Sequence, residues 1–274
     1  LLHLADEGLL DMDAPVADAV EWGAAHPDIT PAQLVSNSSG LVGLLPDLAY
    51  APYLCQLLAD RELESCGVEI FQTDGDDADV VAPDTEFRYG GGQWQVAGAV
   101  AEAVSGQSWA ELIDEIYVQP CGVESLGYNN HWAEAGGFGY PDDFDPADLS
   151  PTDNPQMEGG GYITAPDYAE LLLMHLRGGM CDGGRVLSEE AVALAHADRF
   201  AAADADLGAD FPGYGLGWWV DRETGIISDG GAYGSLPWLD VAEGYGAYLV
   251  IEASSGLGSE MFDELSPLVA DAMS

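Results

Sequence analysis

The 274-residue sequence contains no lysine, and its six strongly basic residues are all arginines. A sequence without lysine can form neither a P-loop nor a Schiff base with its substrate. The 49 acidic residues bring the formal net charge to −43, which repels phosphate backbones and anionic lipid surfaces. We therefore expect no nucleic-acid partner. The charge is typical of a protein kept soluble at high salt, or of an acidic secreted protein.

Several sequence motifs are also missing. No apolar run approaches the roughly 18 residues that a membrane span needs, so we expect no membrane insertion. The sequence has no G-x-S-x-G, H-E-x-x-H, G-x-G-x-x-G or C-x-x-C motif, and its five histidines lack ligand spacing. We therefore expect no metal and no cofactor.

Four cysteines are present: Cys55, Cys66, Cys121 and Cys181. Their even number and the short separation of the first two permit disulfides, which form in oxidising compartments. Four buried free thiols are the alternative, and the spacing does not fix a pairing. With disulfides, the protein is expected to be secreted or extracytoplasmic. The sequence leaves its oligomeric state open.

Hydrophobic periodicity indicates an α+β fold in a single domain over residues 1–274, with residues 1–205 mostly helical. Thr30, Ser108 and Ser188 are typical helix N-caps. Antiparallel strands and a C-terminal helix are expected within residues 206–274. The expected helices include 93–104, 109–117, 167–176 and 260–273, and the expected strands are 218–220, 226–228, 236–241 and 247–251. Residues 41–85 show little periodicity, and the acidic run 74–79 within them is expected to be a solvated loop. Residues 128–156 are rich in Gly, Pro, Asp and Asn and are expected to form a surface excursion.

Three glycine-rich islands are candidates for a functional site. They are residues 87–94 (FRYGGGQW), 157–164 (MEGGGYIT) and 228–234 (SDGGAYG). Glycine lets a backbone approach a ligand closely, and a tyrosine at a helix start lies in a field that favours its phenolate. The alternatives are an aromatic residue packed beside a flexible turn for Tyr89, and a plain hairpin turn for the third island.

Taken in order, these islands and several other segments resemble the serine β-lactamase and penicillin-binding protein superfamily, which includes class C-type esterases. The segments that carry the resemblance are 4–16 (LADEGLLDMDAPV), 29–41 (ITPAQLVSNSSGL), 87–94, 104–109 (VSGQSW), 120–123 (PCGV), 160–169 (GGYITAPDYA) and 214–218 (YGLGW). The resemblance implies a β-lactamase/transpeptidase-like fold, with a helix-rich portion packed on an antiparallel sheet.

The resemblance also implies acyl transfer by a serine in an S-x-x-K motif, about ten residues before Leu1. We therefore expect a fragment that lacks the first strands, the start of the nucleophile helix and the Ser/Lys pair, and that is inactive alone. By resemblance, Tyr89 relays the proton and the Ala232 N–H contributes to the oxyanion hole. The substrate-binding positions are Gly91, Gly160, Asp229, Gly231 and Tyr233.

Two departures from the family pattern bear on the substrate. The family's Y-x-N reads Tyr89-Gly90-Gly91, and its K-T-G or H-x-G reads Asp229-Gly230-Gly231. An aspartate at this place repels the carboxylate of β-lactams. The sequence therefore favours an esterase or a peptidase, acting on a small-molecule or peptide substrate, over an efficient β-lactamase. The alternative is a non-catalytic homologue that serves as a binding or sensor module.

Overall fold

The contacts within the chain divide it into two units. The first contains residues 1–116 and 125–162, and the second contains residues 117–124 and 163–274. The computed structural model describes residues 1–44, 50–73, 79–131, 149–200 and 212–273. This division differs from the expected halves 1–205 and 206–274, because the helices of residues 165–196 belong to the same unit as the strands.

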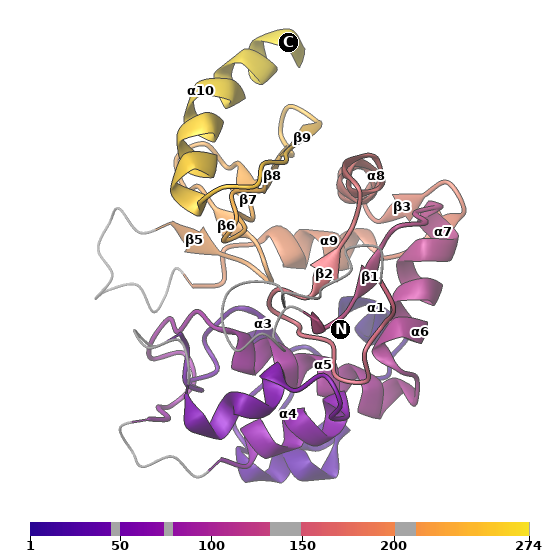
Figure 1. Ribbon diagram of the computed structural model, residues 1–274, viewed down its shortest axis with the longest axis vertical. Coiled ribbons are helices and arrows are strands. Elements are labelled where there is room, and N and C mark those ends of the chain that lie inside the picture. Colours follow the sequence, from indigo (N-terminus) through magenta and orange to yellow (C-terminus); the bar gives the residue numbers. More distant parts are fainter. Residues whose placement is uncertain (45–49, 74–78, 132–148, 201–211, 274) are drawn as a thin grey trace. The chain divides into compact units, whose positions relative to one another are not determined.

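The first unit is mainly helical, and most of its helices are short (Figure 1). Its elements are α1 (Leu2–Asp6), α2 (Val16–Ala19), η1 (Glu21–Ala25), α3 (Pro31–Val35), η2 (Ala51–Leu57), α4 (Leu63–Phe71), α5 (Gly91–Ser105), α6 (Trp109–Ile113), β1 (Gly127–Tyr128) and β2 (Gly161–Tyr162). The π-helical turn η3 (Asp114–Val118) follows α6 and leads into the second unit.

Helix α5 is the longest helix of the first unit, and α4 packs against it. The contact is close because Gly67 of α4 lacks a side chain: a Cβ there would overlap that of Ala99. The apolar residues Ile70, Val96 and Val100 are fully buried. Removing such side chains from water is the main source of stability for this pair of helices.

The second unit combines helices with an antiparallel sheet. Its elements are α7 (Gln119–Cys121), α8 (Ala165–Leu176), β3 (Met180–Cys181), β4 (Gly184–Arg185), α9 (Glu189–His196), β5 (Gly213–Tyr214), β6 (Trp219–Val220), β7 (Ile227–Ser228), β8 (Leu236–Asp240), β9 (Tyr245–Leu249) and α10 (Ser255–Met273). Strands β5 to β9 form one antiparallel meander in chain order.

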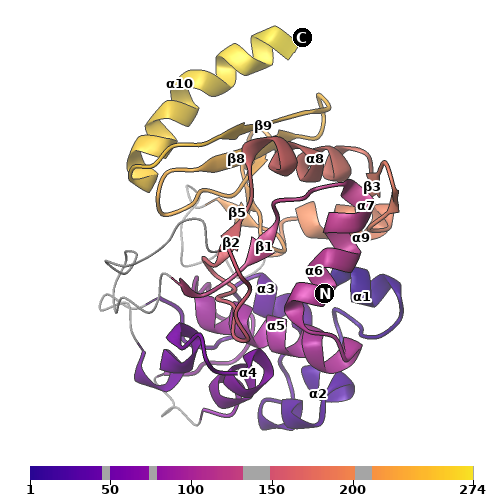
Figure 2. The ribbon, with the colours of Figure 1, turned by 45° about the vertical axis from the view of Figure 1, so that its right-hand side comes forward.

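Helices cover both faces of this meander (Figure 2). Leu239 packs with Leu172 of α8 on one face, whereas Trp238 packs with Phe262 of α10 on the other. Consecutive residues of a strand point to opposite faces, so β8 contributes to both hydrophobic clusters. Burial on both faces explains why β8 reads as the nearly continuous apolar run LPWL.

The α+β class predicted from the sequence is confirmed, and so are three of its helix N-caps. The hydroxyls of Thr30, Ser108 and Ser188 each accept a hydrogen bond from the backbone N–H three residues on. Helix α5 begins at Gly91, two residues before the expected start, since two glycines join its first turn. Residues 41–85, which show little periodicity, contain η2 and α4, and neither was predicted. Residues 74–78 of the acidic run lie outside the described residues.

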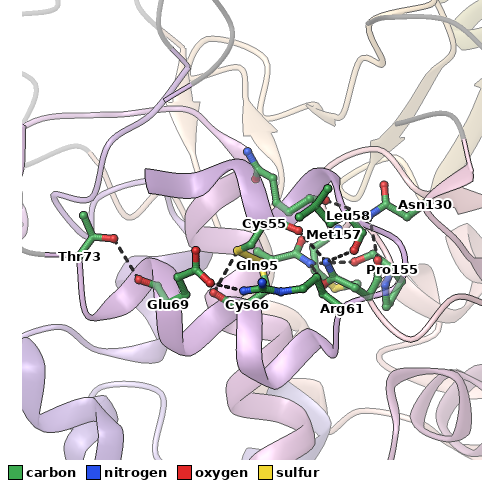
Figure 3. The surroundings of a disulfide bond; sticks show 12 residues. Cys55, Leu58, Arg61, Cys66, Glu69, Thr73, Gln95, Asn130, Pro155 and Met157 are labelled. Atoms are coloured by element: carbon green, nitrogen blue, oxygen red, sulfur yellow. Dashed lines mark hydrogen bonds and ion pairs between the residues drawn. A yellow bond between two sulfur atoms is a disulfide. The ribbon is translucent and has the colours of Figure 1, made fainter. Parts of the chain in front are cut away.

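Both cysteine pairs form disulfides, each within one unit. Cys55 is bonded to Cys66 and Cys121 to Cys181, so the free-thiol alternative is wrong. The sequence separations are 11 and 60 residues. On the loop-entropy account, such bonds stabilise the folded state by about 3 and about 4 kcal/mol, respectively. The first bond joins η2 to α4 (Figure 3).

Candidate active site

Tyr89 lies two residues before α5 and is partly exposed. Its backbone carbonyl accepts a hydrogen bond from the Leu44 N–H at 2.7 Å, and its ring lies 6.5 Å from that of Phe87. The first amides of a helix carry partial positive charge, which favours an anionic group nearby. The role of Tyr89 as a proton relay stays a prediction.

A buried amide network fixes the backbone on both sides of Tyr89. The Gln93 Nε2 donates to Asn37 Oδ1 at 2.8 Å and to the Arg88 carbonyl at 2.6 Å. The Ser39 hydroxyl donates to Gln93 Oε1 at 2.6 Å. Asn37, Ser39 and Gln93 are fully buried, so each bond is made away from water, where losing a partner is costly. Sequence reasoning gave Gln93 no such role.

The three glycines after Tyr89 do permit a close approach, but by other parts of this chain. A Cβ at Gly90 would lie 2.8 Å from the Gly43 Cα, and one at Gly92 would lie 2.7 Å from the Tyr53 ring. A Cβ at Gly91 would overlap the carboxylate of Glu158. The first island is therefore a crowded segment rather than a flexible turn.

Gly160 also lies in a tight turn of the first unit. Its N–H donates to the Gln156 carbonyl at 2.8 Å, and its own carbonyl accepts from the Asn129 N–H at 3.0 Å. A Cβ on Gly160 would overlap the Asn129 carbonyl oxygen. The glycine is thus required for the path of the backbone, whatever else it contacts. Its role in substrate binding stays a prediction.

A second buried amide network holds the segment before Gly160 (Figure 3). Asn154 donates from Nδ2 to the carbonyls of Cys55 and Leu58, both at 2.9 Å, and accepts at Oδ1 from Gln95 at 2.7 Å. Asn130 donates to the carbonyl of Asn154 at 2.9 Å. These side chains are fully buried, so the expectation of a surface excursion over 128–156 is wrong at Asn130 and Asn154, whereas residues 149–151 are exposed as expected. Residues 132–148 lie outside the described residues.

The third island forms the connection between β7 and β8 in the second unit. Ala232 therefore lies in a loop, not on a strand as expected. Its carbonyl accepts from the Ser255 N–H at 3.1 Å, and the Tyr233 carbonyl accepts from the Ala253 N–H at 2.8 Å. Among the described residues, the Ala232 N–H donates to no acceptor. An unused backbone donor in a tethered loop is the kind of group that forms an oxyanion hole.

A cavity of about 240 Å³ adjoins this loop. Its lining includes Trp219, Gly231 and four hydroxyl-bearing residues, Ser228, Ser235, Ser255 and Ser259. Tyr233 is exposed, with 53% of its surface accessible, and Gly231 donates its N–H to the Ser235 carbonyl at 2.8 Å. The loop is thus a hairpin connection, which was the alternative for the third island, and it also borders the cavity.

Asp229 begins the loop, and burial raises the pKa of its carboxyl to about 6. Within the described part of the chain its side chain makes no hydrogen bond or ion pair that would offset this. The same part of the chain contains no cluster of three or more His, Cys, Asp or Glu side chains placed to hold a metal ion.

Because Asp229 has a higher pKa in the folded than in the unfolded state, its ionisation destabilises the fold at neutral pH. We expect Asp229→Asn to raise the free energy of unfolding by about 1–2 kcal/mol at pH 7.5, since one pKa unit corresponds to about 1.4 kcal/mol and Asp229 is only half-buried. The gain should vanish near pH 4. Urea unfolding at both pH values measures it, with exposed Asp263→Asn as the control. A gain that is independent of pH would contradict the assignment.

The family model described as Beta-lactamase matches residues 1–270. The chain belongs to the Beta-lactamase family. It is therefore a member of a family of serine hydrolases, and the predicted superfamily and fold are confirmed. The seven predicted site residues divide between the units: Tyr89, Gly91 and Gly160 lie in the first, and Asp229, Gly231, Ala232 and Tyr233 in the second.

Known members of the superfamily are similar to this chain over most of its length. Penicillin-binding protein 4 of Amycolatopsis lactamdurans is 26% identical over 286 residues, covering 97% of the chain and 71% of the relative. A putative β-lactamase structure from Bacteroides dorei DSM 17855 is 27% identical, with a TM-score of 0.64 over 90% of this chain and 72% of the other. A family VIII carboxylesterase structure has a TM-score of 0.68 at 19% identity, covering 92% and 73%.

Proposed function

We propose that this Beta-lactamase family chain supplies the proton relay and the oxyanion-hole loop of a serine hydrolase that cleaves esters or amides. The observation that carries the proposal is the placement of Tyr89 at the start of α5, with its backbone held by the buried Asn37–Gln93 network. The family match over residues 1–270 supports it.

In the proposed reaction, a serine hydroxyl adds to the substrate carbonyl carbon while the Tyr89 phenolate accepts the hydroxyl proton. The carbonyl oxygen becomes an oxyanion and accepts a hydrogen bond from the Ala232 N–H. Collapse of this intermediate breaks the bond to the alcohol or amine, which takes the proton back from Tyr89. Water then hydrolyses the acyl-enzyme by the same steps and releases the acid.

The substrate preference follows from the two departures in sequence. Gly91 has no side-chain amide to bind the substrate, and Asp229 places a carboxylate where the family has lysine or histidine. A second carboxylate on the substrate would be repelled there, and most of all when Asp229 is ionised. We therefore favour an ester or peptide substrate without a carboxylate over a β-lactam.

The nucleophile is tested by labelling the protein expressed from its complete reading frame with a fluorophosphonate. We expect one serine, in an S-x-x-K motif, to be modified and located by peptide mass spectrometry. Residues 1–274 expressed alone serve as the matched control and should not be labelled, because they contain no lysine to activate a serine. A complete protein that resists the label would refute the enzymatic proposal.

The absence of lysine also favours a second candidate, a non-catalytic module that keeps the fold and binds a ligand. The two candidates differ in the reading frame upstream of residue 1. An S-x-x-K motif there supports the hydrolase, and its replacement supports the binding module.

We further propose an extracytoplasmic location, because two disulfides persist in oxidising compartments. No helix among the described residues is both long and apolar enough to cross a membrane.

A further inference from the structure

Glu158 occupies the space in which a side chain at position 91 would lie. A Cβ built on Gly91 would overlap Glu158 Oε2 and would lie 2.9 Å from both Cβ and Cδ of the same residue. The absent side chain at 91 and the carboxylate at 158 are therefore parts of one arrangement. It places a negative charge at the first residue of α5, two positions after Tyr89.

The position of Glu158 is fixed by its neighbours on both sides. The Met157 N–H donates to Gln95 Oε1 at 3.1 Å, and the Gln95 side chain is itself bonded to Asn154. The turn at Gly160 closes the segment on its other side. Met157 also packs onto α5, because its Sδ would lie 2.8 Å from a Cβ at Gly98. The carboxylate is thus carried by an anchored segment.

The Glu158 carboxylate makes no hydrogen bond or ion pair with any of the described residues. Glu158 keeps solvent-exposed surface, while the protein that surrounds its carboxylate raises its pKa above the ordinary value by partial desolvation. The N-cap residue of α5 is Gly90, which has no side chain to cap the helix, and among the described residues no hydrogen bond joins Glu158 to the first N–H groups of α5. A partly desolvated, unpaired carboxylate gains most from a cationic partner.

We propose that Glu158 is a specificity-determining residue that binds an ammonium group of the substrate beside Tyr89. This inference rests on the proposed function and names its substrate class: esters or amides that carry a primary ammonium a few bonds from the scissile carbonyl. The three N–H donors of an ammonium match a carboxylate that has no partner among the described residues. The net charge of −43 adds long-range attraction for such cations at low salt.

The test uses residues 1–274 and two probes of similar size, N-(4-aminobutyl)acetamide and its uncharged analogue N-butylacetamide. Titration calorimetry at pH 7.5 should give a dissociation constant about tenfold lower for the ammonium probe, as expected for a hydrogen-bonded charge pair. Glu158→Gln should abolish this preference and leave the affinity for N-butylacetamide unchanged. Glu252→Gln, an exposed site in the second unit, makes the same charge change and should retain the preference.

Gly91→Ala is a second variant, because its methyl group displaces the Glu158 carboxylate without altering any charge. We expect it to weaken the preference, with circular dichroism confirming that the fold is kept. Equal affinities for the two probes in the unmodified chain, no detectable binding of the ammonium probe, or an unchanged preference in Glu158→Gln would each overturn the proposal. A labelled serine in the complete protein together with any of these results would leave the hydrolase intact and remove only the role of Glu158.

Discussion

Tyr89→Phe is expected to lower kcat for ester hydrolysis by about 10²- to 10⁴-fold in the protein expressed from its complete reading frame, if Tyr89 is the general base. The change removes one hydroxyl and keeps the ring that lies beside Phe87. The network from Asn37 to Gln93 contacts only the backbone near Tyr89, so folding should be little affected. Steady-state hydrolysis of p-nitrophenyl acetate measures the effect.

Tyr50→Phe is the matched control, since it also removes one phenolic hydroxyl from the first unit. That hydroxyl donates to Asp79 at 3.0 Å and has no part in the proposed reaction. The control should keep its activity within a few-fold of the unmodified protein. If Tyr89→Phe behaves like the control, Tyr89 is a packed aromatic residue and the proton relay lies elsewhere.

Acidification is expected to destabilise the second unit through two adjacent histidines. His196 Nε2 lies 3.0 Å from His175 Nδ1, and both rings meet Trp218 edge-on. Burial lowers the pKa of His175 to about 3, with a contribution from His196, and burial also lowers that of His196 to about 4. The unfolded chain therefore binds protons first as the pH falls below about 6.5.

The free energy of unfolding should fall by about 3 kcal/mol between pH 7 and pH 4.5 on account of this pair. Each pKa unit corresponds to about 1.4 kcal/mol. The expected change is smaller than the sum of the two histidine contributions, because His196 is only partly buried and solvent screens its charge. The double variant His175→Leu/His196→Leu should lose this dependence, because replacing both partners by apolar groups leaves no unpaired donor.

Urea unfolding of residues 1–274 at the two pH values gives the difference between the variant and the unmodified chain. That subtraction removes the contribution of the many carboxylates, which is common to both proteins. His131→Leu is the control, because its Nε2 lies near the Ser150 carbonyl of the first unit, outside the pair. A double variant with the same acid sensitivity as the unmodified chain would show that other groups govern acid unfolding.

The sequence predicted those parts of the fold that depend on local signals. An N-cap hydrogen bond joins a hydroxyl to the backbone N–H three residues later, so it depends on local sequence alone. The helix starts at Thr30, Ser108 and Ser188 were therefore predictable. The meander over β6 to β9 followed from short apolar runs separated by turn glycines. The two-residue strand β5 was not predicted.

The sequence did not predict features that depend on distant partners. Helix α4 is short and its cysteine and glycine obscure the apolar pattern, whereas its burial comes from α5. Asn130 and Asn154 look like loop residues because amides are usually exposed. The carbonyls of Cys55 and Leu58 accept from Asn154, and those of Gln56 and Asn154 accept from Asn130, which explains their burial.

The candidate site shows the same limit. Tyr89 and the glycines around it were found through their resemblance to a family, whereas Glu158 was passed over as one acidic residue among 49. Its significance comes from an absent atom at Gly91, 67 positions earlier in the numbering. No pattern within a sequence window reports that two such positions share one volume.

The bonds from Ser255 and Ala253 to the carbonyls of Ala232 and Tyr233 have a consequence for comparing relatives. They fix the peptide groups that follow Ala232 and Tyr233, so the direction of the Tyr233 N–H, which shares its peptide group with the Ala232 carbonyl, depends on the start of the final helix, about twenty positions further along the chain. Two homologues with identical glycine loops can therefore aim this amide differently when their 253–255 turns differ. A comparison of substrate selectivity among relatives therefore has to include both the glycine loop and the 253–255 turn.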